Sequence, residues 1–236
     1  MRTGNEKLVS GEGFTDFVQN NRKPIFISAS VVVLALAVTI VALVVSDFSR
    51  NRAVAAVEEL GLRFRELGTG SPAETGFGID DGADIGTAED GEASELVLEI
   101  RRFAEKNSGY AGARAWSMVA GFHGGKKQWA QAEEAWLAAA RAAGNSYMGP
   151  IALFNAAVAA EEQGKPEAAL EHYRRSLASK VGFFAAPRAQ LAVGRLLEVA
   201  GDTEGAVEAY RRFLSLWPEE ATMAGIANSR IIVLER

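Results

Sequence analysis

The chain has 236 residues and a formal net charge of −5, and 48% of its residues are hydrophobic. This length and balance suit one or two folded domains, and nothing suggests the concentrated basic face of a nucleic-acid-binding protein. The absence of cysteine excludes disulfides, Cys-ligated zinc or iron–sulfur sites and cysteine nucleophiles.

A short polar tail, residues 1–23, precedes an uncharged apolar segment over residues 24–45, PIFISASVVVLALAVTIVALVV. A helix of this length is roughly 33 Å long, and a bilayer's hydrocarbon core is about 30 Å thick. A buried core helix would normally show a polar stripe. A cleaved signal peptide would have a shorter apolar region and small residues before its cleavage point. The segment has none of these features, so we predict a single transmembrane helix.

The charges that flank this segment leave its orientation open. Arg22 and Lys23 stand before it, and Arg50 and Arg52 stand after it. The numbers of Lys and Arg residues on the two sides are nearly equal, so the positive-inside rule does not indicate which side is cytoplasmic. The rule is also weaker when a long domain must be translocated across the membrane.

Residues 46–112 are expected to form a leading pair of helices around an acidic loop. Apolar residues recur at helical spacing before and after residues 68–93. Residues 68–93 are rich in glycine and carry seven acidic residues but no Lys or Arg, which favours a solvated loop. Their Asp spacing does not fit a calcium-binding loop.

The second half of the chain contains a repeat with a period of 37 residues. The stretch 164-GKPEAALEHYRRSL-177 returns as 201-GDTEGAVEAYRRFL-214, and the same step backwards reaches 127-KQWAQAEEAWLAAA-140. In each window an alanine is followed four residues later by an aromatic residue: Ala132 and Trp136, Ala169 and Tyr173, Ala206 and Tyr210. The glutamates of the windows, Glu133, Glu171 and Glu208, are expected on the solvent side.

An apolar helical stretch precedes each window, so every unit is predicted to be a helix, a tight turn and a second helix. The predicted units are 113–149, 150–186 and 187–223. The remaining residues to 236 are predicted to form a capping helix.

This pattern resembles the tetratricopeptide repeat, a helix–turn–helix unit of about 34 residues. The alanines and aromatic residues match the family's second helix, Trp116 its early tryptophan, Gly194 its first-helix glycine and Pro218 its closing proline. The resemblance covers roughly residues 113–223. It implies a helical-hairpin solenoid, so together with the predicted transmembrane helix and the capping helix the expected fold class is all-α.

No set of catalytic residues stands out, and we expect no enzyme, no cofactor and no metal. The two histidines, His123 at a repeat-core position and His172 beside Tyr173, are expected to be packed or at the surface. The glycine-rich stretch GFHGGKK lacks the P-loop spacing and its Ser or Thr.

In tetratricopeptide arrays the first helix of each unit lines a concave face. The resemblance implies that the residues at the matching positions of this chain line the same face. The implied partner-binding groove consists of Arg114, Met118, Phe154, Asn155, Val158, Arg188, Leu191 and Arg195. Apolar and cationic side chains together suit an extended peptide with an acidic group or a C-terminus. The alternative is that some of them are packing residues or solvated arginines. The family's carboxylate clamp is incomplete, because Ser117 and Gly121 stand where it needs Lys and Asn.

The order of polar tail, apolar span and repeats resembles the YfgM-like envelope proteins, although the acidic insertion is longer than that family suggests. The resemblance implies a bacterial inner-membrane protein with a cytoplasmic N-terminus and periplasmic repeats. It also implies association with the SecYEG translocon and a PpiD-like chaperone, assisting protein export. Two alternatives are a membrane-tethered scaffold for cell-envelope or cell-division assembly and a cytoplasm-facing adaptor.

Overall fold

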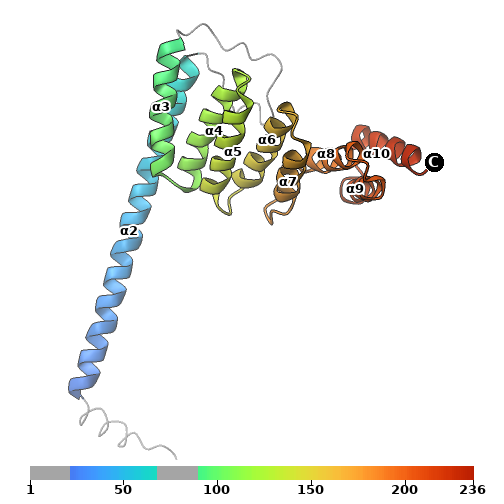
Figure 1. Ribbon diagram of the computed structural model, residues 1–236. Coiled ribbons are helices and arrows are strands. Elements are labelled where there is room, and N and C mark those ends of the chain that lie inside the picture. The colour runs from blue at the N-terminus through green and yellow to red at the C-terminus, as the bar shows by residue number, and fades with distance from the viewer. Residues whose placement is uncertain (1–21, 68–89) are drawn as a thin grey trace, which may run out of the picture. The chain divides into compact units, whose positions relative to one another are not determined.

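The computed structural model describes residues 22–67 and 90–236, in which all regular structure is helical (Figure 1). The predicted all-α fold class is therefore confirmed for these residues. Residues 1–21 of the predicted tail and residues 68–89 of the predicted acidic loop lie outside the described residues. The chain divides into two compact units, Met1–Arg52 and Ala53–Arg236.

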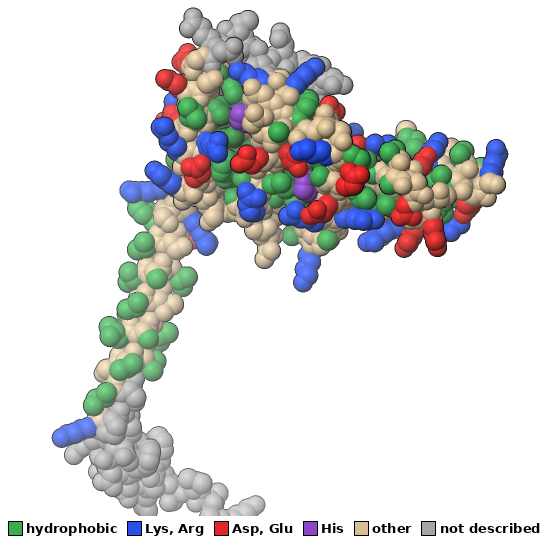
Figure 2. All heavy atoms as spheres, in the orientation of Figure 1, with side chains coloured by type: hydrophobic (Ala, Val, Ile, Leu, Met, Phe, Trp, Pro, Cys, Tyr) green, Lys and Arg blue, Asp and Glu red, His purple; other side chains and the backbone are tan. Residues whose placement is uncertain are grey.

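The first unit contains most of α2, which runs over Arg22–Glu66. In this unit the large apolar side chains that the structure describes, from Ile27 to Phe48, are exposed, and Figure 2 shows them along the described part of the helix. Thr39, the one hydroxyl residue in the middle of this run, donates its Oγ1 proton to the Ala35 carbonyl oxygen at 2.8 Å. Among the described residues, α2 is the one helix long and apolar enough to cross a membrane.

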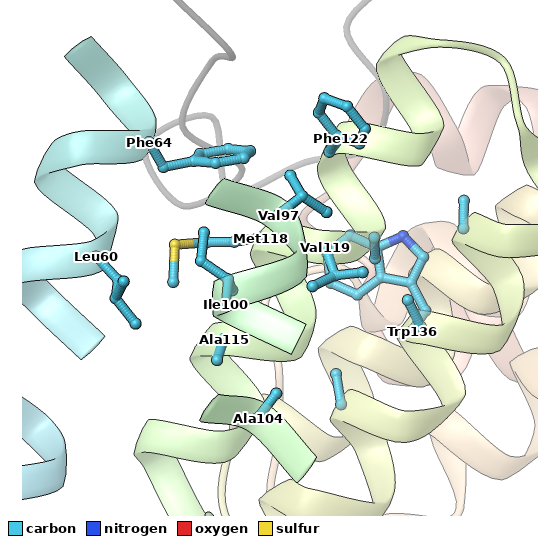
Figure 3. Close-up of a cluster of buried hydrophobic side chains, with 14 of the residues drawn as sticks. Leu60, Phe64, Val97, Ile100, Ala104, Ala115, Met118, Val119, Phe122 and Trp136 are labelled. Atoms are coloured by element: carbon cyan, nitrogen blue, oxygen red, sulfur yellow. The ribbon is translucent and has the colours of Figure 1, made fainter. Parts of the chain in front are cut away.

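The second unit begins with a helix pair. The last part of α2, from Ala53 onwards, packs against α3 (Asp90–Lys106), and both contribute to one hydrophobic cluster with α4. Figure 3 shows Leu60 and Phe64 of α2 facing Ile100 and Met118 across this cluster. The guanidinium group of Arg63 donates two hydrogen bonds to the Glu99 carboxylate, at 3.0 and 2.8 Å.

Three helical hairpins follow in chain order, and each helix packs on its neighbour. Their helices are α4 (Gly109–Gly125), α5 (Trp129–Ala143), α6 (Met148–Glu162), α7 (Pro166–Leu177), α8 (Ala186–Val199) and α9 (Thr203–Leu216). Pro166 occupies the first turn of α7, where its missing N–H costs nothing. The Asp202 carboxylate caps α9 by accepting a hydrogen bond from the Gly205 N–H at 2.9 Å.

The hairpin turns share one backbone conformation. Gly164 and Gly201 have φ angles of 69° and 79°, and Lys127 has 57° at the equivalent position of the first hairpin. The N–H of each donates to a carbonyl three residues back, at 2.8, 3.0 and 2.8 Å respectively. Glycine adopts this left-handed region without strain, whereas lysine does not.

The repeated alanine and aromatic residues form the packing seam of the hairpins, as the sequence predicts. Ala132, Ala169 and Ala206 are fully buried, at 0% exposure. The aromatic partners Trp136, Tyr173 and Tyr210 are buried as well. A small side chain lets the two helix backbones approach, and the ring fills the groove beside it.

One expectation about the surface needs correction. Glu133 is not on the solvent side, because only 13% of its side chain is exposed and it bonds to the next unit. The predicted C-terminal helix is present as α10 (Ala221–Leu234), which packs on α9 through the buried Ala227 and has apolar side chains on its outer side. Ile232 and Val233 there are 57% and 54% exposed.

Candidate interaction surface

Three of the residues predicted to line the groove are packed inside the second unit. Arg114, Met118 and Phe154 are 8%, 1% and 7% exposed. Met118 belongs to the cluster that α2 and α3 build over α4, and the Nε atom of Arg114 lies 4.0 Å from Glu58 Oε1 on α2. The leading helix pair therefore covers the first helix of the first hairpin.

The predicted groove residues of the second hairpin are only partly open. Phe154 packs edge-on against Tyr173, with ring centroids 5.4 Å apart, and lies 6.3 Å from Phe183. Asn155 and Val158 are half-buried, and Val158 packs against the second hydrophobic cluster, which spans α6 to α10. Phe154 and Val158 therefore act as packing residues in the structure, which corresponds to the alternative interpretation.

The predicted residues of the third hairpin lie together. Arg188, Leu191 and Arg195 of α8 line one hollow of about 540 Å³, which we call the α8–α10 hollow. Arg188 and Arg195 are exposed and Leu191 is half-buried. This part of the predicted groove is open to solvent.

The end of α8 and two other helices complete the hollow with residues outside the predicted groove. Glu198 and Val199 come from the end of α8, Tyr210 from α9, and Ile226 and Arg230 from α10. The apolar spacing in α10 predicts a helix. It does not reveal which of its sides faces α8, because that depends on how α10 rotates as it packs on α9.

Carboxylates of the chain already hold two of the arginines of the hollow. Arg230 binds Glu198 through two nitrogens, and its Nε lies 3.0 Å from Glu198 Oε2. Arg195 is paired with Glu161 of α6. Tyr210 donates its hydroxyl proton to Glu198 at 3.3 Å, and burial raises the pKa of this tyrosine, so it remains a neutral donor.

A second polar cluster joins the first two hairpins. Glu133 Oε1 lies 3.1 Å from His172 Nε2, and Gln163 donates to Glu133 Oε2 at 2.7 Å. The Lys165 ammonium lies 3.6 Å from the same carboxylate. Burial alone would raise the pKa of Glu133, but the hydrogen bonds from His172 and Gln163 and the charge of Lys165 outweigh it, so the pKa is lowered.

The residues of this cluster do not form a recognised set of catalytic residues. His172 is packed, and His123 is half-buried with its Nδ1 2.6 Å from Gln128 Oε1 in the first hairpin turn. Within residues 22–67 and 90–236, no group of three or more His, Cys, Asp or Glu residues could hold a metal ion. The polar cluster instead fixes one hairpin against the next.

The three helical hairpins, with their alanine–aromatic seam and left-handed turns, agree with a comparison of the chain with models of known protein families. The tetratricopeptide repeat model matches residues 124–182 and 162–221. The helix array is of the tetratricopeptide-repeat type. Tetratricopeptide arrays are suited to protein–protein interaction, and this family is typically a non-catalytic scaffold.

The chain is also similar to a protein of Treponema pallidum (strain Nichols) described as "TPR repeat-containing protein". The two chains are 36% identical over 126 residues, which is 53% of this chain and 52% of the relative. The match thus spans about half the length of that relative. No solved structure matches the chain significantly.

Proposed function

We propose that the protein is a membrane-tethered scaffold that binds other proteins through its tetratricopeptide array. The observation that carries the proposal is the combination, in one chain, of an apolar helix long enough to span a bilayer and a repeat array with an open hollow. Residues 24–45 serve as the span in this proposal, and the units 113–149, 150–186 and 187–223 serve as the scaffold.

The exposed side chains of α2 support the membrane attachment. Val31, Leu34 and Leu43 are 61%, 67% and 64% exposed, and they belong to the uncharged run of residues 31–45, in which Thr39 is the one hydroxyl residue. A contiguous apolar surface of this kind is unfavourable in water and favourable in lipid. The helix satisfies its own backbone hydrogen bonds, as a lipid-exposed segment must.

At a finer level, we propose that the scaffold assists protein export or chaperone handover at the SecYEG translocon, with a PpiD-like chaperone as partner. The order of polar tail, single span and repeats supports this proposal through its resemblance to the YfgM-like proteins. Its orientation has the N-terminus in the cytoplasm and the repeats in the periplasm. The alternative is a scaffold for cell-envelope or cell-division assembly.

Protease treatment of spheroplasts tests the orientation. With a C-terminal epitope tag, the repeats are expected to be digested in spheroplasts and protected in intact cells. A cytoplasmic protein serves as the control for membrane integrity. If the region beyond residue 46 remains protected in spheroplasts and is digested only after lysis, the periplasmic orientation is wrong.

Site-specific photo-cross-linking tests the partner. The photoreactive residue replaces Leu191 or Val199 in the hollow, and Glu171 or Arg175 on the exposed side of α7 as matched controls. Phe154 is a poor site because it is buried. Cross-links to SecYEG subunits or a PpiD-like chaperone from the hollow alone are expected. Recovery of only cell-wall or division proteins would overturn the translocon role in favour of the alternative.

A further inference from the structure

An exposed aromatic residue recurs with the period of the repeat at the start of each hairpin. Tyr110, Tyr147 and Phe184 are spaced by 37 residues, and they are 38%, 55% and 53% exposed. Tyr110 lies in the first turn of α4, Tyr147 stands directly before α6, and Phe184 stands two residues before α8. The alanine–aromatic seam is buried, whereas much of the surface of these three rings is open, so hairpin packing does not account for them.

The three rings lie along one edge of the second unit. The two helices of a hairpin are antiparallel, so the connections after α3, α5 and α7 share one edge and the hairpin turns share the opposite edge (Figure 1). We call the surface formed by three segments of the first of these edges the connection edge: residues 106–110, 141–147 and 178–184.

The aromatic surface is confined to the connection edge. Burial of Tyr110 and its hydrogen bond to Glu58 raise the pKa of Tyr110, and the proximity of Tyr147 raises it further, so these two rings are neighbours. The hairpin turns on the opposite edge contain no aromatic residue in any of their three segments: 126–128, 163–165 and 200–202.

The connection edge is also cationic. Lys106, Arg141 and Lys180 are exposed, one in each segment, and none of them forms an ion pair with another described residue. The three segments contain no Asp or Glu. The nearby carboxylates of Glu58 and Glu105 already have partners within the fold. The edge therefore presents aromatic rings and positive charge together.

This character ends at the third hairpin. The connection between α9 and α10, residues 217–220, carries Glu219 and Glu220. Trp217 in the same connection is half-buried and packs against Phe213, with ring centroids 5.8 Å apart. The aromatic and cationic surface thus belongs to the part of the array that is nearer to α2 in the chain.

The chain also enters the second unit at the connection edge. Glu58, close to the start of the part of α2 that belongs to this unit, accepts a hydrogen bond from the Tyr110 hydroxyl at 2.7 Å. Arg63, five residues further along α2, pairs with Glu99, which is further from the edge on α3. The seven residues 46–52 separate the predicted span from this unit, and seven residues reach at most about 25 Å.

We propose that the connection edge rests on the surface of the membrane, with its aromatic rings at the level of the lipid headgroups and its cations on the phosphates of anionic lipids. Tyrosine favours this level because its ring is apolar and its hydroxyl is polar. Each Lys or Arg near an anionic surface strengthens attachment roughly fivefold. The inference rests on the proposed function, since it needs the membrane span.

The experiment uses the full chain in lipid nanodiscs that contain phosphatidylglycerol. Because the chain has no cysteine, a single introduced cysteine carries a fluorophore at a chosen position. Asn145→Cys places it on the connection edge, and Ala130→Cys places it at the opposite end of α5; both residues are exposed. Lipids with a nitroxide on the headgroup quench fluorophores at the bilayer surface. Strong quenching at position 145 and little at position 130 is expected, and equal quenching at both would refute the proposal.

Lipid composition and salt test the charge part of the proposal. Replacing phosphatidylglycerol by phosphatidylcholine, or raising the salt concentration, is expected to reduce the quenching at position 145, because both changes weaken the attraction between the cations and the surface. Quenching that is insensitive to both changes would overturn the role of the three cations.

Matched variants of the Asn145→Cys chain locate the contact. Lys180→Gln is expected to weaken attachment about fivefold and to lower the quenching, whereas Lys127→Gln in the hairpin turn of the opposite edge should leave it unchanged. Tyr147→Ser should lower the quenching as well, and Ile232→Ser, at a similar exposure of 57% on α10, should not. Equal effects within either pair would show that the connection edge is not the contact.

Two further readouts separate this inference from the proposed function. Extraction of the chain from membranes by alkaline carbonate would overturn the membrane span and with it the proposed function. A chain that resists extraction but shows no preferential quenching at position 145 overturns the inference alone. Photo-cross-links from position 147 to a protein, without headgroup quenching, would assign the edge to a protein partner and overturn the inference in the same way.

Discussion

Gly194 lies where α8 approaches the ring of Tyr210, and its replacement by alanine tests the packing of the third hairpin. A Cβ atom on Gly194 would lie 2.5 Å from Cε1, 2.8 Å from Cδ1 and 2.9 Å from Cζ of that ring. Carbon atoms in contact prefer about 3.5–4.0 Å, so the ring or the helix must move by about 1 Å. Tyr210 is 2% exposed, which leaves the ring little space to move into.

The size of the effect follows from two opposing terms. Overpacking of a buried site costs about 1–3 kcal/mol. Replacing a glycine inside a helix by alanine contributes about 0.5–1 kcal/mol in the other direction. Gly225 of α10 serves as the control, because a Cβ there would meet nothing within 4 Å. The propensity term is common to both variants, so Gly194→Ala should be less stable than Gly225→Ala by about 1–3 kcal/mol.

Urea and thermal unfolding of the fragment 47–236, followed by circular dichroism, measure this difference. In a fragment of this size, about 1 kcal/mol corresponds to a shift of roughly 2–4 °C in Tm. Gly225→Ala should melt at or slightly above the wild type and Gly194→Ala below it. Adding Tyr210→Leu should reduce the cost of Gly194→Ala, since the obstructing ring is gone. If Gly194→Ala is as stable as Gly225→Ala, the inferred close approach of α8 to Tyr210 is wrong.

Two further substitutions test the turn and the polar cluster. Lys127→Gly should raise the unfolding free energy by about 0.5–1 kcal/mol, because Lys127 has the left-handed φ that Gly164 and Gly201 supply in the other hairpins; a lower Tm would contradict this. Glu133→Gln should cost about 1–2 kcal/mol at pH 7, whereas Glu171→Gln on the exposed side of α7 should cost little. The folded state lowers the pKa of Glu133 from 4.5, so its carboxylate stabilises the fold fully above that pH and progressively less as the pH falls through the folded pKa. Unfolding curves between pH 3 and 7 check this, and a gap between Glu133→Gln and wild type that widens towards pH 3 would refute it.

The repeat architecture could be predicted from the sequence because its signals are local. The alanine and aromatic residue of each second helix stand four residues apart, which places them on neighbouring turns of one helix face. Ala169 and Tyr173 are accordingly buried together in the structure. Gly164 and Gly201 mark the turns for a similar reason, since glycine suits a left-handed residue.

The candidate site could be predicted only in part. Arg188, Leu191 and Arg195 share one side of a single helix, α8, and the resemblance to the tetratricopeptide repeat, applied position by position, was enough to group them. Arg114 and Met118 have a similar pattern on α4, yet they are buried. Helical periodicity identifies a side chain's face but does not indicate whether another helix covers it.

The sequence by itself determined the apolar helix, the helical repeats, their seam and the lack of cysteine chemistry, because these depend on composition and on residues close together in the chain. The tertiary structure decided which repeat surfaces remain open. The end of α2 covers α4, Glu133 bonds to residues at least 30 positions away, and α10 turns Ile226 and Arg230 towards α8. Each of these contacts depends on how whole helices rotate and pack, and the free energy that fixes them comes from buried area shared between distant segments.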